Sequence, residues 1–190
     1  MRSFTLIEII VVISIILILS ILAFPNFREA NSKFALDRSI YKLSQNFRNA
    51  EEISMSARTT PIEFGSTFFP KGGYGLYFQE NSSSYVLFAD CDGDGQYDTA
   101  DSPPRASNCS EAKISKPYPE KIEDIALESG IKIGTLTPKN PADKSLSITF
   151  FPPDPTITIF PSASTAFISV FFGSKMETVS INLNGLIEIQ

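Results

Sequence analysis

Residues Phe4–Phe24 read FTLIEIIVVISIILILSILAF and decide the fold. As an α-helix this stretch would be about 31 Å long, close to the thickness of the hydrocarbon core of a bilayer. It contains no charge from Ile9 onward, and Glu8 is its single acid. We therefore expect residues 4–27 to form a transmembrane helix that carries one carboxylate near its start.

A secretory signal peptide or a simple membrane anchor is the ordinary alternative for such a segment. Glu8 interrupts the apolar run where a signal peptide normally stays uncharged, and no small-residue cleavage site follows the run. Pro25 lacks a backbone N–H, so it is expected to kink or locally unwind the helix where it leaves the membrane.

The helical pattern continues through residues 28–58. Apolar residues recur mostly every three or four positions, and charged residues occupy the other faces. The predicted apolar stripe consists of Phe27, Ala30, Phe34, Ile40, Leu43, Phe47, Ala50, Ile53 and Ala57. No glycine occurs before Gly65. We expect these residues to extend the same helix as an amphipathic half that packs on the following domain.

Residues 59–190 have the character of a β-rich head. Short runs of β-branched and aromatic residues alternate with Gly, Pro, Asn and Asp. Asn184-Gly185 is a strong hairpin signal near the carboxyl terminus. The runs predict strands at Tyr74–Phe78, Tyr85–Ala89, Ile131–Leu136, Leu146–Phe151, Thr156–Phe160, Phe167–Phe172, Thr178–Leu183 and Leu186–Ile189. The predicted fold class is α+β, with one long amino-terminal helix packed on a β-rich carboxyl-terminal head.

The composition excludes several functions. A net charge of −5 argues against nucleic-acid binding, which requires a basic face to neutralise phosphates. The chain has no histidine, so Ser-His and Cys-His nucleophilic pairs are impossible. We therefore do not expect an enzyme.

Residues 90–101 read DCDGDGQYDTAD and follow the spacing of a twelve-residue calcium loop. Gly93 and Gly95 allow the tight curl that brings alternating carboxylates to one centre. The alternative is an acidic, solvated turn between strands. We expect a structural Ca²⁺, and the predicted ligands are Asp90, Asp92, Asp94, Gln96 through its carbonyl, Asp98 and Asp101.

The chain has two cysteines, Cys91 inside this loop and Cys109 beyond it. We expect a disulfide between them if the head lies in an oxidising compartment, and two free, buried thiols are the alternative.

The amino terminus carries a resemblance to a known family. Phe4-Thr5-Leu6-Ile7-Glu8, followed by an apolar run and Pro25, resembles the start of type IV pilins and type II secretion pseudopilins. The resemblance implies that a prepilin peptidase removes residues 1–3, cutting between Ser3 and Phe4, and that the amino group of Phe4 is methylated. The family usually has glycine where this chain has Ser3. The head resembles that of H-type minor pseudopilins more loosely.

The resemblance also implies that Phe4, Glu8 and Pro25 serve filament assembly. An unpaired carboxylate inside a bilayer costs on the order of 3 kcal/mol. Pairing Glu8 with the amino terminus of a neighbouring subunit would remove this penalty and fix the stagger between helices. In the alternative, the Glu8 side chain extends to the headgroups near Arg2.

The expected function is that of a minor structural subunit of a type IV pilus-like or type II secretion pseudopilus filament. Its expected partners are other such subunits, the prepilin peptidase and the inner-membrane assembly platform. The resemblance implies that the chain crosses the bacterial cytoplasmic membrane once, with a cytoplasmic amino terminus and an extracytoplasmic head. The alternative is a membrane-anchored binding or adhesion module that does not polymerise.

Overall fold

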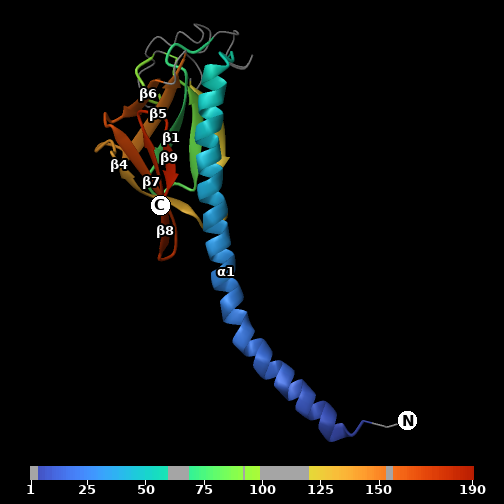
Figure 1. Ribbon diagram of the computed structural model, residues 1–190. Coiled ribbons are helices and arrows are strands. Elements are labelled where there is room, and N and C mark those ends of the chain that lie inside the picture. Colours follow the sequence, from blue (N-terminus) through green and yellow to red (C-terminus); the bar gives the residue numbers. More distant parts are fainter. Residues whose placement is uncertain (1–3, 60–68, 92, 99–119, 153–155) are drawn as a thin grey trace. The chain divides into compact units, whose positions relative to one another are not determined.

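The computed structural model describes residues 4–59, 69–91, 93–98, 120–152 and 156–190 (Figure 1). Within helix α1 (Leu6–Met55), the side chains of residues 22–30 are not described. The chain divides into two compact units, Met1–Ala35 and Leu36–Gln190.

The predicted fold class is corrected by this arrangement. The side chains of helical residues are described over two shorter stretches, 6–21 and 31–55, and most of the remaining chain lies in two antiparallel sheets. The unit that holds the sheets begins only at Leu36, so the amino-terminal stretch is not part of it. Within the described residues, no helix combines the length and the apolar character that crossing a membrane requires. The prediction of one long helix packed on the head was wrong because apolar residues keep their helical spacing even in turns that do not pack on the sheets.

The strands form a five-stranded sheet with the order β3-β2-β1-β5-β6 and a four-stranded sheet with the order β4-β7-β8-β9. Every described strand pair is antiparallel. The strands are β1 (Tyr74–Gln79), β2 (Ser84–Ala89), β3 (Lys121–Ala126), β4 (Lys132–Thr137), β5 (Ser145–Phe151), β6 (Thr156–Phe160), β7 (Thr165–Phe172), β8 (Lys175–Asn182) and β9 (Ile187–Ile189).

The carboxyl-terminal part of α1 lies along one face of the five-stranded sheet (Figure 1). Phe47 is fully buried, with its ring centroid 5.7 Å from that of Phe78 on β1. The predicted stripe is confirmed at Ile40, Leu43, Phe47 and Ala50, which are all buried. It is wrong at Phe34, which is 58% exposed.

Polar bonds fix the helix in register on this sheet. Asn46 Nδ2 donates to the Tyr85 hydroxyl at 2.6 Å, and the backbone amide of Tyr74 donates to Ser54 Oγ at 3.0 Å. Both tyrosines are almost fully buried. Burial raises the pKa of each tyrosine to about 12, because the phenolate would be desolvated.

The opposite face of the same sheet is covered by the loop that follows β2. Successive strand residues point to opposite faces, so Tyr77 and Phe88 face away from the helix. The ring of Tyr97 packs 4.7 Å from that of Tyr77 and 5.4 Å from that of Phe88. The loop is therefore anchored to the sheet by an aromatic cluster.

All eight predicted strands are confirmed, with small shifts at their ends. The hairpin at Asn184-Gly185 is confirmed too, since Gly185 has φ +80° and its amide donates to the Asn182 carbonyl. Strand β3 was missed. Its sequence KIEDIA lacks a run of apolar residues because it is an edge strand, and Ile125 is its only buried side chain.

Candidate functional site

The amino-terminal acid takes part in a helix cap. Glu8 Oε2 accepts a hydrogen bond from the backbone amide of Thr5 and another from its hydroxyl, each at 2.8 Å. In return, the amide of Glu8 donates to Thr5 Oγ1 at 3.4 Å. This reciprocal arrangement is a capping box, which satisfies amide groups that the first helical turn leaves without partners.

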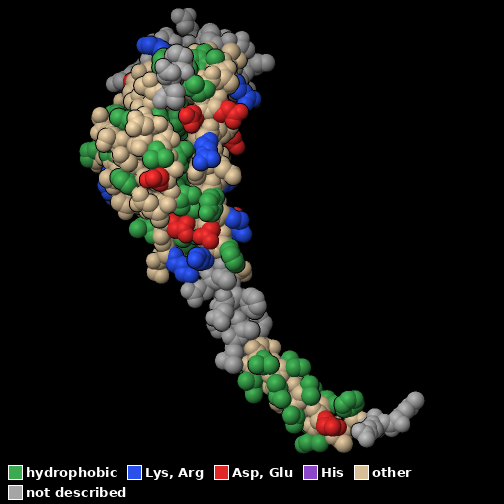
Figure 2. Space-filling view, viewed as in Figure 1, with side chains coloured by type: hydrophobic (Ala, Val, Ile, Leu, Met, Phe, Trp, Pro, Cys, Tyr) green, Lys and Arg blue, Asp and Glu red, His purple; other side chains and the backbone are tan. Residues whose placement is uncertain are grey.

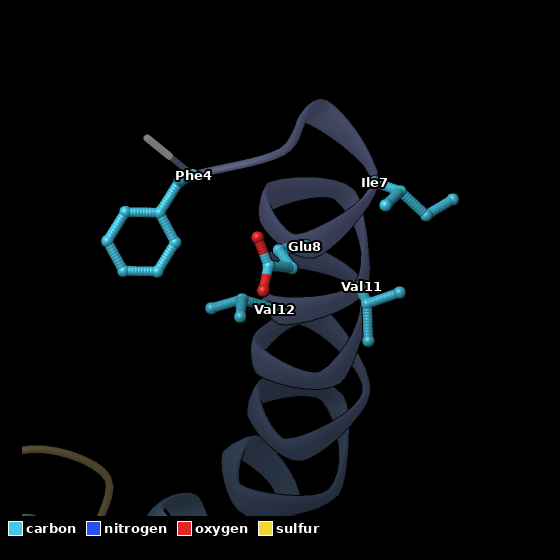
Figure 3. A pocket seen from close by; sticks show the side chains of 5 residues that line it. All are labelled: Phe4, Ile7, Glu8, Val11 and Val12. Carbon is cyan, nitrogen blue, oxygen red and sulfur yellow. The ribbon is translucent and has the colours of Figure 1, made fainter. Parts of the chain in front are cut away.

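The same carboxylate lies in a shallow groove of about 340 Å³ on one face of the helix. Figure 3 shows Phe4 and Val12 to one side of Glu8 and Ile7 and Val11 to the other. The Glu8 carboxylate is thus the polar centre of an otherwise apolar groove.

The described surface of residues 4–21 is almost entirely apolar, and Glu8 is the single charged side chain among these residues (Figure 2). The exposed fractions of the large apolar side chains in this stretch run from 49% at Val11 to 80% at Phe4. Ser14 and Ser20 bond to carbonyls one turn back in the helix, each at 2.8 Å, so their hydroxyls do not break the apolar surface. A continuous apolar surface of this kind marks a region that lipid or another protein covers.

Two other residues predicted to act at this end lie outside what the structure describes. Ser3 is among residues 1–3, and the side chain of Pro25 falls within residues 22–30. The predicted cleavage and the predicted effect of Pro25 on the helix stay predictions.

The loop in the head curls around Asp90, as its glycines predicted. Asp90 Oδ1 accepts the amide of Gly93 at 2.7 Å, and Oδ2 accepts the amide of Gly95 at 2.9 Å. Both glycines have positive φ, +81° and +78°, which other residues rarely adopt. The first carboxylate of the motif is therefore held at the centre of the curl.

Three further predicted ligand residues, Asp94, Gln96 and Asp98, also lie on the described part of this loop. Asp94 accepts the backbone amide of Gln96 at 2.8 Å and its side-chain amide at 3.2 Å, while Asp98 is nearly buried. Asp92 and Asp101 lie outside the described residues. In the part of the chain that is described, no three acidic side chains are grouped closely enough to hold a metal ion. Because two of the six predicted ligand residues are missing from that set, the calcium site stays a prediction.

Glu120 also reaches this loop, and the sequence reasoning missed it. Its Oε1 accepts the amide of Cys91 and its Oε2 accepts the amide of Asp98, both at 2.8 Å. Glu120 is only 1% exposed. Burial raises its pKa to about 9, the amide bonds oppose the rise, and the charges of Asp98 and Asp90 add to it. The buried acid thus ties the two ends of the loop together.

The capping box at Thr5 and Glu8 and the contact of Glu120 with the loop were both missed from the sequence, although the sequence contains a signal for each. Thr5-Leu6-Ile7-Glu8 has the T-x-x-E spacing of a capping box. Glu120 directly precedes β3, and the amide of Ala89 at the end of β2 donates to its carbonyl. Recognising β3 as the partner of β2 would have placed Glu120 beside the loop.

Cys91 is fully buried against Tyr74 and Ala89. Its predicted partner, Cys109, lies outside the described residues, so the disulfide stays a prediction.

Comparison of the chain with family models, with curated proteins and with solved structures found no match.

Proposed function

We propose that the chain is a structural subunit of a type IV pilus-like or type II secretion pseudopilus filament and that it polymerises through its amino-terminal helix. The observation that carries the proposal is the apolar helix surface from Leu6 to Ile21 with the Glu8 carboxylate set into it. The capping box would explain this carboxylate on any helix, but within an apolar surface a carboxylate is costly in a bilayer unless it is paired.

A second copy of the chain would supply a cationic partner for this carboxylate. Both Thr5 bonds end on Oε2 of Glu8, and a carboxylate can accept further bonds at its other oxygen. If cleavage before Phe4 exposes a new amino group, that cation can pair with Glu8 of a neighbour. Apolar residues on both sides of Glu8 would then exclude water from the pair, which strengthens the attraction.

The proposal also covers processing and location. A prepilin peptidase cuts between Ser3 and Phe4 and the new amino group is methylated. The apolar segment is held in the cytoplasmic membrane until an assembly platform adds the subunit to the filament. The head then lies outside that membrane, where a Cys91–Cys109 disulfide and a calcium ion on the loop from Asp90 would stabilise it.

The specific observation that favours the second candidate function is a groove in the head that is lined by polar side chains, such as Lys71 and Thr158, together with Phe151. A membrane-anchored binding module that does not polymerise would use that groove and would not need Glu8.

The mature amino terminus tests the proposal. Intact-mass and fragment-ion measurements are made on the protein recovered from sheared surface filaments. We expect a chain that begins at N-methylated Phe4. A chain that still begins at Met1, or that begins after a signal-peptide cleavage within the apolar run, would contradict the proposal.

A further inference from the structure

Strand β9 forms an edge of the four-stranded sheet and directs backbone groups outward. The Thr178 amide donates to the Gln190 carbonyl at 3.0 Å, and the Gln190 amide donates to the Thr178 carbonyl at 2.8 Å. Because bonded and non-bonded pairs alternate along an antiparallel ladder, the amides and carbonyls of Ile187 and Ile189 point away from β8. Among the described residues, none bonds to these outward groups. They are therefore available to a further strand.

The side chains of β9 alternate in kind. Ile187 and Ile189 lie on the same face as their partners on β8, Ile181 and Val179, which are fully buried. Ile189 is 39% exposed, so the apolar face of the sheet is incomplete at this edge. Glu188 lies on the opposite face and is exposed. An added strand would complete the apolar face if it had apolar residues beside the two isoleucines and a cation beside Glu188.

The turn that leads into β9 enlarges the apolar surface at this edge. Leu183 and Leu186 are 44% and 54% exposed, and both lie in the turn between β8 and β9. Exposed apolar side chains grouped beside an open strand edge are typical of a surface that another chain covers.

The edge strands of the chain itself do not supply the matching strand. Two copies of β9, paired antiparallel so that both open residues are used, would bring their Glu188 carboxylates opposite each other, which is destabilising. Strand β6 carries no charge, and Lys121 of β3 is already paired with Asp124. The edge of β4 is covered at Ile133, whose amide and carbonyl bond to the turn between β1 and β2. The occupant that fits is therefore a segment of a different protein.

We propose that β9 binds an extended segment of another protein in which a lysine or arginine stands between two apolar residues. The segment adds to the sheet as an antiparallel strand, so its apolar residues bond through their backbones to Ile187 and Ile189 and its cation pairs with Glu188. This proposal does not rest on polymerisation, because β9 belongs to the compact unit Leu36–Gln190 and not to the amino-terminal stretch.

The test uses the isotope-labelled full chain in detergent micelles and a synthetic peptide, Thr-Val-Lys-Val-Thr, that is capped at both ends. Amide hydrogen exchange is followed residue by residue by NMR. The amides of Ile187 and Ile189 should exchange rapidly in the free protein and at least about tenfold more slowly with saturating peptide. Glu188→Lys should weaken peptide binding about threefold or more, and this variant should prefer a peptide with glutamate in place of lysine.

Two controls accompany the test. Glu123→Lys makes the same charge change at an exposed position on the other sheet and should leave binding unchanged. A peptide with N-methylated valines lacks the backbone donors and should not bind. Failure of the unmodified peptide to slow exchange at Ile187 and Ile189, or equal binding of the N-methylated peptide, would overturn the proposal. Slow exchange of both amides in the absence of peptide, with self-association of the chain, would overturn it in favour of a second copy. Glu8→Gln should keep full peptide binding even if it abolishes filaments, so the two proposals fail separately.

Discussion

Glu120 Oε2 accepts a hydrogen bond from the amide of Asp98 at 2.8 Å, across a sequence separation of 22 residues. Its other oxygen holds Cys91 in the same way. Glu120→Ala would leave both amide groups without these bonds, and a buried unsatisfied polar group costs about 1–3 kcal/mol. We expect the free energy of unfolding in urea to fall by about 2 kcal/mol or more. Glu123→Ala is the control, since Glu123 is exposed on β3. Equal stability of the two variants would show that the Glu120 bonds do not hold the loop.

Calcium should stabilise the chain if the loop from Asp90 binds it. A site with a dissociation constant of about 10⁻⁴ M, at a calcium concentration about 100 times higher, gains about 2.7 kcal/mol. We expect calcium to raise the melting temperature of chelator-treated protein, and Asp98→Asn to reduce this rise. Magnesium at the same concentration is the control. An unchanged melting temperature at millimolar calcium would leave the acidic, solvated turn as the correct interpretation.

The head should lose stability at alkaline pH through Tyr74 and Tyr85. Folding raises both pKa values from 10.0 to about 12. A group whose pKa is higher in the folded state contributes its full stability below the unfolded value and loses it as the pH rises through the folded value. The wild type should therefore weaken between about pH 10 and 12, and the double variant Tyr74→Phe, Tyr85→Phe should weaken less. Urea unfolding at several pH values measures this, with exposed Tyr41→Phe as the control. Parallel pH profiles for the wild type and the double variant would contradict the assignment.

The helix should owe its position in the head to Phe47. This ring is fully buried against Phe78, and removing a buried phenylalanine typically costs about 3–5 kcal/mol. We expect Phe47→Ala to cost an amount in this range in urea unfolding. Tyr41→Ala, at a site that is 61% exposed on the same helix, should change stability by no more than about 0.5 kcal/mol. A similar loss for both variants would mean that the helix is not held by its buried face.

Local patterns predicted the strands better than the overall architecture. Strands such as Leu146–Phe151 can be recognised in the sequence because β-branched and aromatic side chains cluster between residues that interrupt strands. The predicted apolar stripe of the helix included Phe34, which has helical spacing but is exposed. Helical periodicity of apolar residues identifies an apolar face of the helix, but it does not identify the surface that covers this face.

The loop shows the same limit for the candidate site. Asp90, Gly93 and Gly95 lie in one short motif, so their mutual bonds could be predicted from spacing. Glu120 contacts Asp98 only because β3 pairs with β2. The charged sequence of β3 does not look like a strand, so this pairing was not predicted. Contacts that depend on pairing between strands far apart in the sequence can be predicted only once the fold is known.

The central claim is that the charge of Glu8, and not its capping role, drives assembly. Glutamine also serves in a capping box, so Glu8→Gln keeps the cap and removes the charge. Thr5→Ala does the reverse, because it removes the hydroxyl bonds and keeps the carboxylate. The two variants therefore separate the two roles of one side chain.

The most direct measurement is the fraction of each variant recovered in sheared filaments, relative to the amount in the membrane fraction of the same cells. We predict that Glu8→Gln is present in the membrane and lost from filaments, while Thr5→Ala is found in both. Filaments that contain Glu8→Gln at the wild-type level would contradict the account.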